Sequence, residues 1–218
     1  ALFGAFVATF FSPLPFYAAL LLSYGHAASA CTAGFVVWLW DRERARLRTP
    51  RGAGLSWLAL GAAIGVAMLV RPQNAILAIL PLFTWLSAAR RMASAAEGRT
   101  LVGHVALGVV FAGAAVAVFS PQLWFWYSHT GELFVVPQSE HYMRWGAPRI
   151  WQTLFSSQAG LLTWSPFLYT SVVGLGLCAW KKETRELGLP LLVLFAVHTY
   201  VAACVMAPPC PLLAAARR

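Results

Sequence analysis

The side chains best placed for chemistry are a cation and an imidazole, each at the end of an apolar stretch. Arg71 stands directly before Pro72, where one apolar stretch ends. A guanidinium suits phosphate or pyrophosphate oxygens, because its planar fork donates paired hydrogen bonds. The alternative is an arginine whose side chain only extends toward a membrane interface. His26 follows Tyr24 at the end of another apolar stretch, and it is either a ligand contact or a structural histidine.

A second set of candidates lies in the segment 121–159, which mixes aromatic with polar side chains. His129 and Glu132 are three residues apart, but this spacing matches no metal motif, and we predict no metal site. An aromatic belt at the headgroup level of a membrane would explain the aromatic residues, although not the His, Glu and Arg residues among them. We therefore predict a polar substrate-binding surface, formed by Gln122, Trp124, Tyr127, His129 and Arg144.

The carboxylates limit the choice of a general base, which glycosyl and phosphoryl transfer usually takes from Asp or Glu. Only Glu132 and Glu140 lie in the segment 121–159, whereas the single aspartate, Asp41, stands among arginines. A catalytic carboxylate on that side is therefore one of these two glutamates, or it lies outside this sequence. No phosphate-binding Gly-rich loop and no GxSxG elbow occurs, so nothing supports ATP-driven transport, and we expect no cofactor.

The composition indicates which elements must position these residues. Of the 218 residues, 60% are hydrophobic and only 11% are charged, and the mean hydropathy is +0.68. A soluble domain of this size could not bury so much apolar surface, and a disordered chain would be far more polar. We expect an all-α fold, a polytopic transmembrane bundle of about six or seven helices with one longer outer loop at 121–159. The apolar stretches are 1–12, 16–40 with a polar break at 23–26, 55–70, 75–89, 101–120, 160–179 and 188–206.

The basic residues predict an orientation. The segments 41–54, 90–100 and 181–186 hold five, three and three of the 16 Lys and Arg residues, and the helix count places all three on one face. By the positive-inside rule this face is cytoplasmic, and 121–159 lies outside. The net charge of +9 is therefore a topology signal. No basic patch with interleaved aromatics is present, so we predict no nucleic-acid partner.

Four stretches together resemble one family of membrane enzymes. In chain order they are 23–27 (SYGHA), Arg71-Pro72 after a Gly/Ala-rich stretch, Phe119–Trp124 (FSPQLW) and the stretch 148–166 with its LFS and GLLTWSP segments. In this order they resemble polytopic glycosyltransferases of the GT-C superfamily, the dolichyl-phosphate-mannose–protein mannosyltransferase-like enzymes. The resemblance covers roughly residues 10 to 205.

The resemblance implies transfer of a sugar from a polyprenyl-phosphate donor to a protein, lipid or glycan acceptor. The reaction would take place at the outer face of the membrane, and a bacterial inner membrane is the expected location. In the family the catalytic base is usually an acidic residue in the first outer loop, which we expect to precede Ala1. Arg71 and the segment 121–151 would then form the surface for donor and acceptor.

Two further expectations concern the chain end and the competing functions. The resemblance implies that residues 1–206 form a partial transmembrane glycosyltransferase domain. The stretch 207–218 departs from the family, and we expect it to be truncated or out of frame. A secondary transporter or lipid flippase is the main alternative, but its polar residues would lie near the middle of the membrane. A non-enzymatic membrane scaffold is the third possibility, and it would leave the outer His, Glu and Arg residues without a role.

Overall fold

The computed structural model describes residues 25–48, 53–94, 98–135, 143–157 and 160–205. Within these ranges the regular structure is helical and contains no strand, which confirms the expected all-α class. The expectations placed on residues 1–24, on Glu140 and on the tail 207–218 lie outside the described residues. The elements in chain order are α3 (His26–Leu47), α4 (Gly54–Val70), the 3-10 helix η1 (Pro72–Ala78), α5 (Ile79–Ser94), α6 (Gly98–Thr130), α7 (Ile150–Phe155), α8 (Leu161–Trp164), α9 (Leu168–Trp180) and α10 (Arg185–Cys204).

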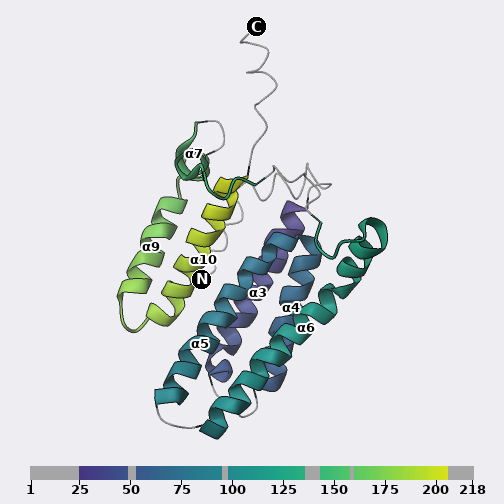
Figure 1. Cartoon of the computed structure of the whole chain (residues 1–218). Helices are drawn as coiled ribbons and strands as arrows, with labels where there is room; N and C mark the ends of the chain where they lie inside the picture. Colours follow the sequence, from purple (N-terminus) through teal and green to yellow (C-terminus); the bar gives the residue numbers. More distant parts are fainter. Residues whose placement is uncertain (1–24, 49–52, 95–97, 136–142, 158–159, 206–218) are drawn as a thin grey trace.

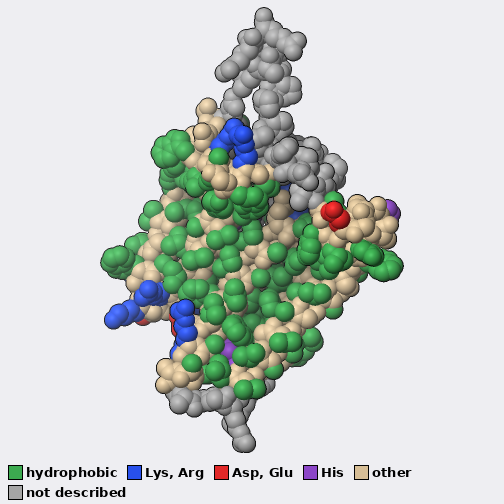
Figure 2. Space-filling view, in the orientation of Figure 1, with side chains coloured by type: hydrophobic (Ala, Val, Ile, Leu, Met, Phe, Trp, Pro, Cys, Tyr) green, Lys and Arg blue, Asp and Glu red, His purple; other side chains and the backbone are tan. Residues whose placement is uncertain are grey.

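Three stretches of helix within the described ranges are long and apolar enough to cross a membrane, namely Pro72–Ser94, Leu101–Thr130 and Arg185–Cys204. The helices α4 and α9 are apolar but shorter, with 17 and 13 residues. Apolar side chains cover most of the face seen in Figure 2. This surface is compatible with a membrane protein, because soluble proteins rarely expose a continuous apolar area of such extent.

The described helices form two groups that lie side by side (Figure 1). Helices α3, α4, α5 and α6 pack along one another in the first group, and α9 and α10 form a hairpin beside it. The hairpin contacts the first group mainly through α10, which touches α5 and η1. At the upper end of the view α3 begins and α4, α6 and α10 end, so these helix termini share one end of the molecule.

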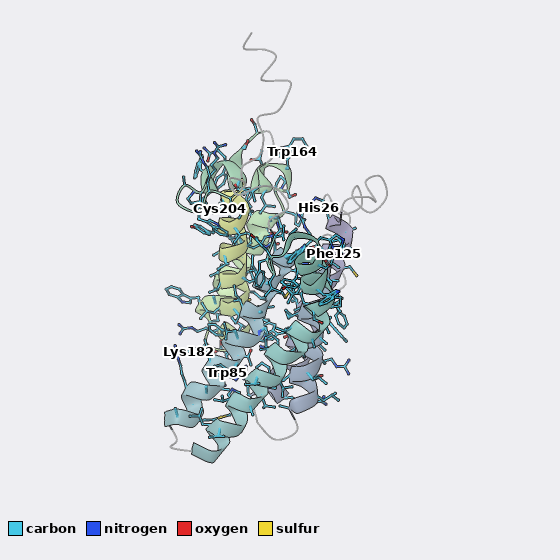
Figure 3. The ribbon with its side chains drawn as sticks, turned by 45° about the vertical axis from the view of Figure 1, so that its right-hand side comes forward. His26, Trp85, Phe125, Trp164, Lys182 and Cys204 are labelled. Carbon is cyan, nitrogen blue, oxygen red and sulfur yellow. The ribbon has the colours of Figure 1, made fainter. Side chains whose placement is uncertain are left out.

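The basic segments meet at the opposite end of the molecule. Glu186, in the first turn of α10, pairs with Arg48 at the end of α3 and with Arg91 in α5, where Oε1 lies 3.4 Å from Nη1. In Figure 3, Lys182 lies toward the lower end, whereas His26 lies toward the upper end. The described residues of the three basic segments therefore lie toward one end of the molecule, as the helix count between the segments predicts.

The expected end of one helix at residue 120 is wrong, because α6 continues through Pro121 to Thr130. A proline inside a helix has no N–H to donate to the carbonyl four residues earlier. Here the hydroxyl of Ser120 donates to the carbonyl oxygen of Ala117 at 2.8 Å, which satisfies the acceptor that Pro121 leaves without its helical bond. The first part of the expected outer loop is therefore helix, and the helical stretch 150–155 interrupts the loop again.

The expectation of one continuous helix over 160–179 is also wrong. It contains two helices, α8 and α9, and Ser165 lies between them with φ −133° and ψ 71°. The residue before a proline is sterically disfavoured from the helical region, and Pro166 follows Ser165. At the other end of the chain, α3 extends through the first arginines to Leu47 rather than ending near residue 40.

A buried carboxylate connects α3 with α4 at the basic end. Glu43 is only 8% exposed, and its Oε2 accepts hydrogen bonds from the hydroxyl of Ser56 at 2.8 Å and from Nη1 of Arg46 at 3.2 Å. The Ser56 hydroxyl, followed by the charges of Arg46 and Arg42, holds the pKa of Glu43 below its usual value, against the opposing effect of burial. The ionised carboxylate is therefore part of the packing between these two helices.

Ser56→Ala should lower the free energy of unfolding near neutral pH by about 1 kcal/mol, because a buried carboxylate loses a donor. The folded-state pKa of Glu43 lies below the usual 4.5, so this stabilisation is present above that value and is lost as the pH falls through the folded pKa. Unfolding midpoints measured against pH should therefore converge for wild type and variant in acid. Ser87→Ala is the control, since the Ser87 hydroxyl donates to the carbonyl of Thr84 in its own helix. An equal loss at all pH values would contradict the prediction.

Candidate functional site

The backbone around Arg71 is held on both sides by hydrogen bonds. Helix α4 ends at Val70, and Arg71 turns to an extended conformation with φ −152° and ψ 121°, as the following proline requires. Its N–H donates to the carbonyl oxygen of Ala67 at 3.1 Å, and its own carbonyl accepts from the N–H of Asn74 at 2.9 Å. The turn between α4 and η1 therefore fixes the direction in which this side chain leaves the backbone.

Arg71 and His26 lie together, as two of the predicted site residues. Nη1 of Arg71 lies 3.0 Å from Nδ1 of His26, the first residue of α3. A guanidinium can only donate, so in this contact Nδ1 of His26 is the acceptor and the imidazole is neutral, with its proton on Nε2. The pair places a permanent positive charge at the shared end of the helices, half-buried between α3 and η1.

A pocket of about 750 Å³ opens beside this pair, between α3, η1, α9 and α10. Arg71, His26 and His198 supply its cation and imidazoles, and Ser29, Gln73 and Asn74 add further polar groups. The rest of the lining is apolar, from α3, η1, α9, α10 and the residue after α10: Ala30, Ala33, Ile76, Leu77, Leu175, Leu191, Leu194, Phe195, Val201, Ala202 and Val205. Such a pocket suits a ligand with an anionic group and an extended hydrocarbon part.

The aromatic candidates lie on α6, away from this lining. Trp124 and Tyr127 are 72% and 54% exposed, and together with Ser120, Pro121 and Leu123 they line a separate hollow of about 490 Å³. Gln122 belongs to the same helical turn and is partly buried. These side chains were expected to form one surface with Arg71, and the structure instead places them in a second, shallow, mostly apolar site.

His129 and Glu132 are exposed and bonded locally. Nδ1 of His129 lies 2.9 Å from the carbonyl oxygen of Phe125, and the two rings are 4.2 Å apart between centroids. The N–H of Glu132 donates to the hydroxyl of Thr130 at 3.3 Å. Neither residue lines the Arg71 pocket, and no Asp or Glu of the described ranges does. Among those same residues no group of three or more His, Cys, Asp or Glu side chains could hold a metal ion.

Arg144 reaches the end of α10 through its backbone. Its N–H donates to the carbonyl oxygen of Cys204 at 2.8 Å, and the preceding residue, Met143, forms an isolated β-bridge with Val205. Val205 itself lines the Arg71 pocket, so the segment that carries Arg144 lies beside the pocket. The Arg144 side chain is exposed and is not part of the lining.

Four polar residues of this pocket were not among the predicted site residues, namely Ser29, Gln73, Asn74 and His198. Ser29 and Asn74 bond each other, and His198 enters the pocket from α10. A histidine inside an apolar helix long enough to cross a membrane is a signal that could have marked His198, because polar side chains are costly within a membrane. Ser29 follows His26 by three residues, which places both on one helical face. The residue that Ser29 bonds, Asn74, is distant in sequence and is brought close only by the fold.

Comparison with known proteins does not name the fold or the site. No protein-family model, no curated protein and no solved structure matches the chain.

Proposed function

We propose that the chain is part of a membrane glycosyltransferase that takes a sugar from a polyprenyl-phosphate donor at the outer face of the membrane. One observation carries the proposal: Arg71, bonded to His26, lies at the polar end of an otherwise apolar pocket between helices. The resemblance of four sequence stretches to GT-C glycosyltransferases supports the same reaction class. The acceptor would be a protein, a lipid or a glycan.

The physical form of the donor fits the pocket. A polyprenyl-phosphate sugar lies in the bilayer with its chain among the helices and its phosphate at the headgroup level. Leucine, phenylalanine and alanine side chains would contact the chain, and the guanidinium of Arg71 would donate to phosphate oxygens. His198 lines the same pocket and would add an imidazole near the phosphate or the sugar.

In the proposed reaction an acceptor hydroxyl oxygen attacks the anomeric carbon of the sugar. A new glycosidic bond forms, the bond between that carbon and the phosphate oxygen breaks, and polyprenyl phosphate leaves with the electron pair. Arg71 would stabilise the charge that develops on the leaving phosphate, which is usually a large part of such catalysis. The acceptor proton would pass to a carboxylate, for which we do not propose Glu132, since this residue is exposed, follows the end of α6 and lies outside the pocket lining.

We further propose a multi-pass arrangement of six or seven helices in a bacterial inner membrane. The three long apolar helices, and the shorter α4 and α9, support several crossings. The shared end of the Arg48, Arg91 and Glu186 ion pairs supports a cytoplasmic basic face. The Arg71 pocket would then lie toward the outer side.

The test is a sugar-transfer assay with the whole protein in liposomes that contain a radiolabelled polyprenyl-phosphate sugar. We expect label to move to an added membrane acceptor fraction, and to stay on the donor in protein-free liposomes. A parallel measurement follows movement of a fluorescent polyprenyl phosphate across the bilayer. Movement without transfer would favour a flippase and contradict the proposal, and an absence of both would favour a scaffold.

A further inference from the structure

Two hydrogen-bonded side-chain pairs connect the start of α3 with the turn that carries Arg71. In the first, Arg71 contacts His26. In the second, the hydroxyl of Ser29 donates to Oδ1 of Asn74 at 3.0 Å. His26 and Ser29 are three residues apart on α3, and Arg71 and Asn74 are three residues apart on the turn. The two pairs therefore lie about one helical turn apart along the same contact between α3 and the turn.

Asn74 is the most constrained of these four residues. It is only 8% exposed, and a buried amide must find partners for both its donor and its acceptor. Its Nδ2 donates to the carbonyl oxygen of Ala67 at 2.9 Å, and its Oδ1 accepts from Ser29. Its backbone N–H donates to the carbonyl of Arg71. One residue thus bonds the last turn of α4, the start of α3 and the backbone of Arg71.

The carbonyl of Ala67 shows how closely Asn74 and Arg71 are coupled. It accepts from Nδ2 of Asn74 and also from the backbone N–H of Arg71, so a shift of either donor disturbs the other. If the Ser29 pair were lost, α3 could slide relative to the turn, and the contact between His26 and the guanidinium would lose its fixed geometry. A charged group must be held to within a fraction of an ångström to use its full binding energy.

We propose that Ser29 and Asn74 are positioning residues, which hold Arg71 and His26 in place for the phosphate of the lipid donor. The inference rests on the proposed function, because it assumes that Arg71 binds that phosphate. Both residues line the pocket, but this role requires no contact between them and the ligand phosphate. Their effect on binding should therefore pass entirely through Arg71.

The experiment measures binding of polyprenyl phosphate to the whole protein in phosphatidylcholine nanodiscs, by native mass spectrometry, well below each variant's melting temperature. We expect Ser29→Ala to weaken binding about fivefold, the factor of one typical hydrogen bond. Asn74→Ala, which removes two bonds, should weaken it more. Ser29→Thr keeps the hydroxyl and should restore binding. Thr32→Ala is the matched control, since the Thr32 hydroxyl donates to the carbonyls of Ala28 and Ser29 in its own helix, and this variant should bind as wild type.

A double-mutant cycle separates positioning from general stability. In an Arg71→Ala background, Ser29→Ala should cause no further loss of affinity, because the group that it positions is already absent. Unchanged affinity in the single variants Ser29→Ala and Asn74→Ala, or the same loss with and without Arg71, would overturn the inference while leaving the proposed function intact. If Arg71→Ala itself binds normally, the proposed role of the pocket fails, and this inference fails with it.

Discussion

Replacement of Arg71 by alanine should weaken binding of a polyprenyl phosphate by about 2–4 kcal/mol, roughly 30- to 1,000-fold in Kd. The guanidinium is half-buried beside a mostly apolar pocket. Once the guanidinium is removed, water in the pocket would be a poor substitute for its hydrogen bonds and charge at the phosphate. Sugar transfer should fall at least as much, because the charge on the phosphate increases as the sugar leaves. Both quantities can be measured in the same nanodisc preparation.

Two variants make the result specific. Arg71→Lys keeps the positive charge but not the planar fork, so it should recover only part of the affinity. Arg149→Ala removes an exposed arginine just before α7, outside the pocket lining, and it should bind as wild type. Equal losses in the Arg71 and Arg149 variants would mean that net charge alone attracts the lipid, and the pocket would lose its assigned role.

The sequence predicted those parts of the fold that depend on local composition. The apolar stretches located α4 and α10 closely, because continuous apolar runs in lipid can only be helical. The stretch 75–89 was less accurate, since it begins inside η1 and ends inside α5. Described residues of the basic segments also lie at one end of the molecule, as the number of helices between these segments predicts. Arg71 and His26 could be singled out because each is a polar residue next to apolar sequence.

The predictions that the structure does not match concern features set by single hydrogen bonds or by contacts between residues distant in sequence. The apolar stretch 101–120 predicted a helix end before Pro121, and the compensating bond from the Ser120 hydroxyl to Ala117 could not be read from composition. The grouping of Trp124 and Tyr127 with Arg71 failed for another reason: the continued helix places the two aromatic side chains around a hollow of their own. The pairing of Ser29 with Asn74 spans 45 residues, and no local pattern indicates it.

A second structural feature absent from the sequence arguments is the close packing of α4 against α6. These two helices make the most extensive contact among the described elements, and two glycines of α4, Gly61 and Gly65, face α6 across it. A Cβ atom on Gly65 would lie 2.7 Å from Cβ of Val118 and 2.8 Å from the carbonyl oxygen of Ala115. Small residues four apart let helix backbones approach closely, which is a common way for helices to associate in lipid.

Gly61→Ala should therefore destabilise the protein by about 1–3 kcal/mol, the usual cost of overfilling a packed contact. The added methyl would collide with the carbonyl oxygen of Phe111 and lie 2.9 Å from Cβ of Ala114, and neither backbone can move without displacing a whole helix. Gly113→Ala is the matched control. It lies on α6, where a Cβ meets nothing within 4 Å, so the higher helix propensity of alanine should stabilise the protein by up to about 1 kcal/mol. Thermal unfolding in detergent should thus move the two midpoints in opposite directions. If both variants shifted upward, helix propensity would outweigh packing at Gly61, and the close contact of α4 with α6 would not be a determinant of this fold.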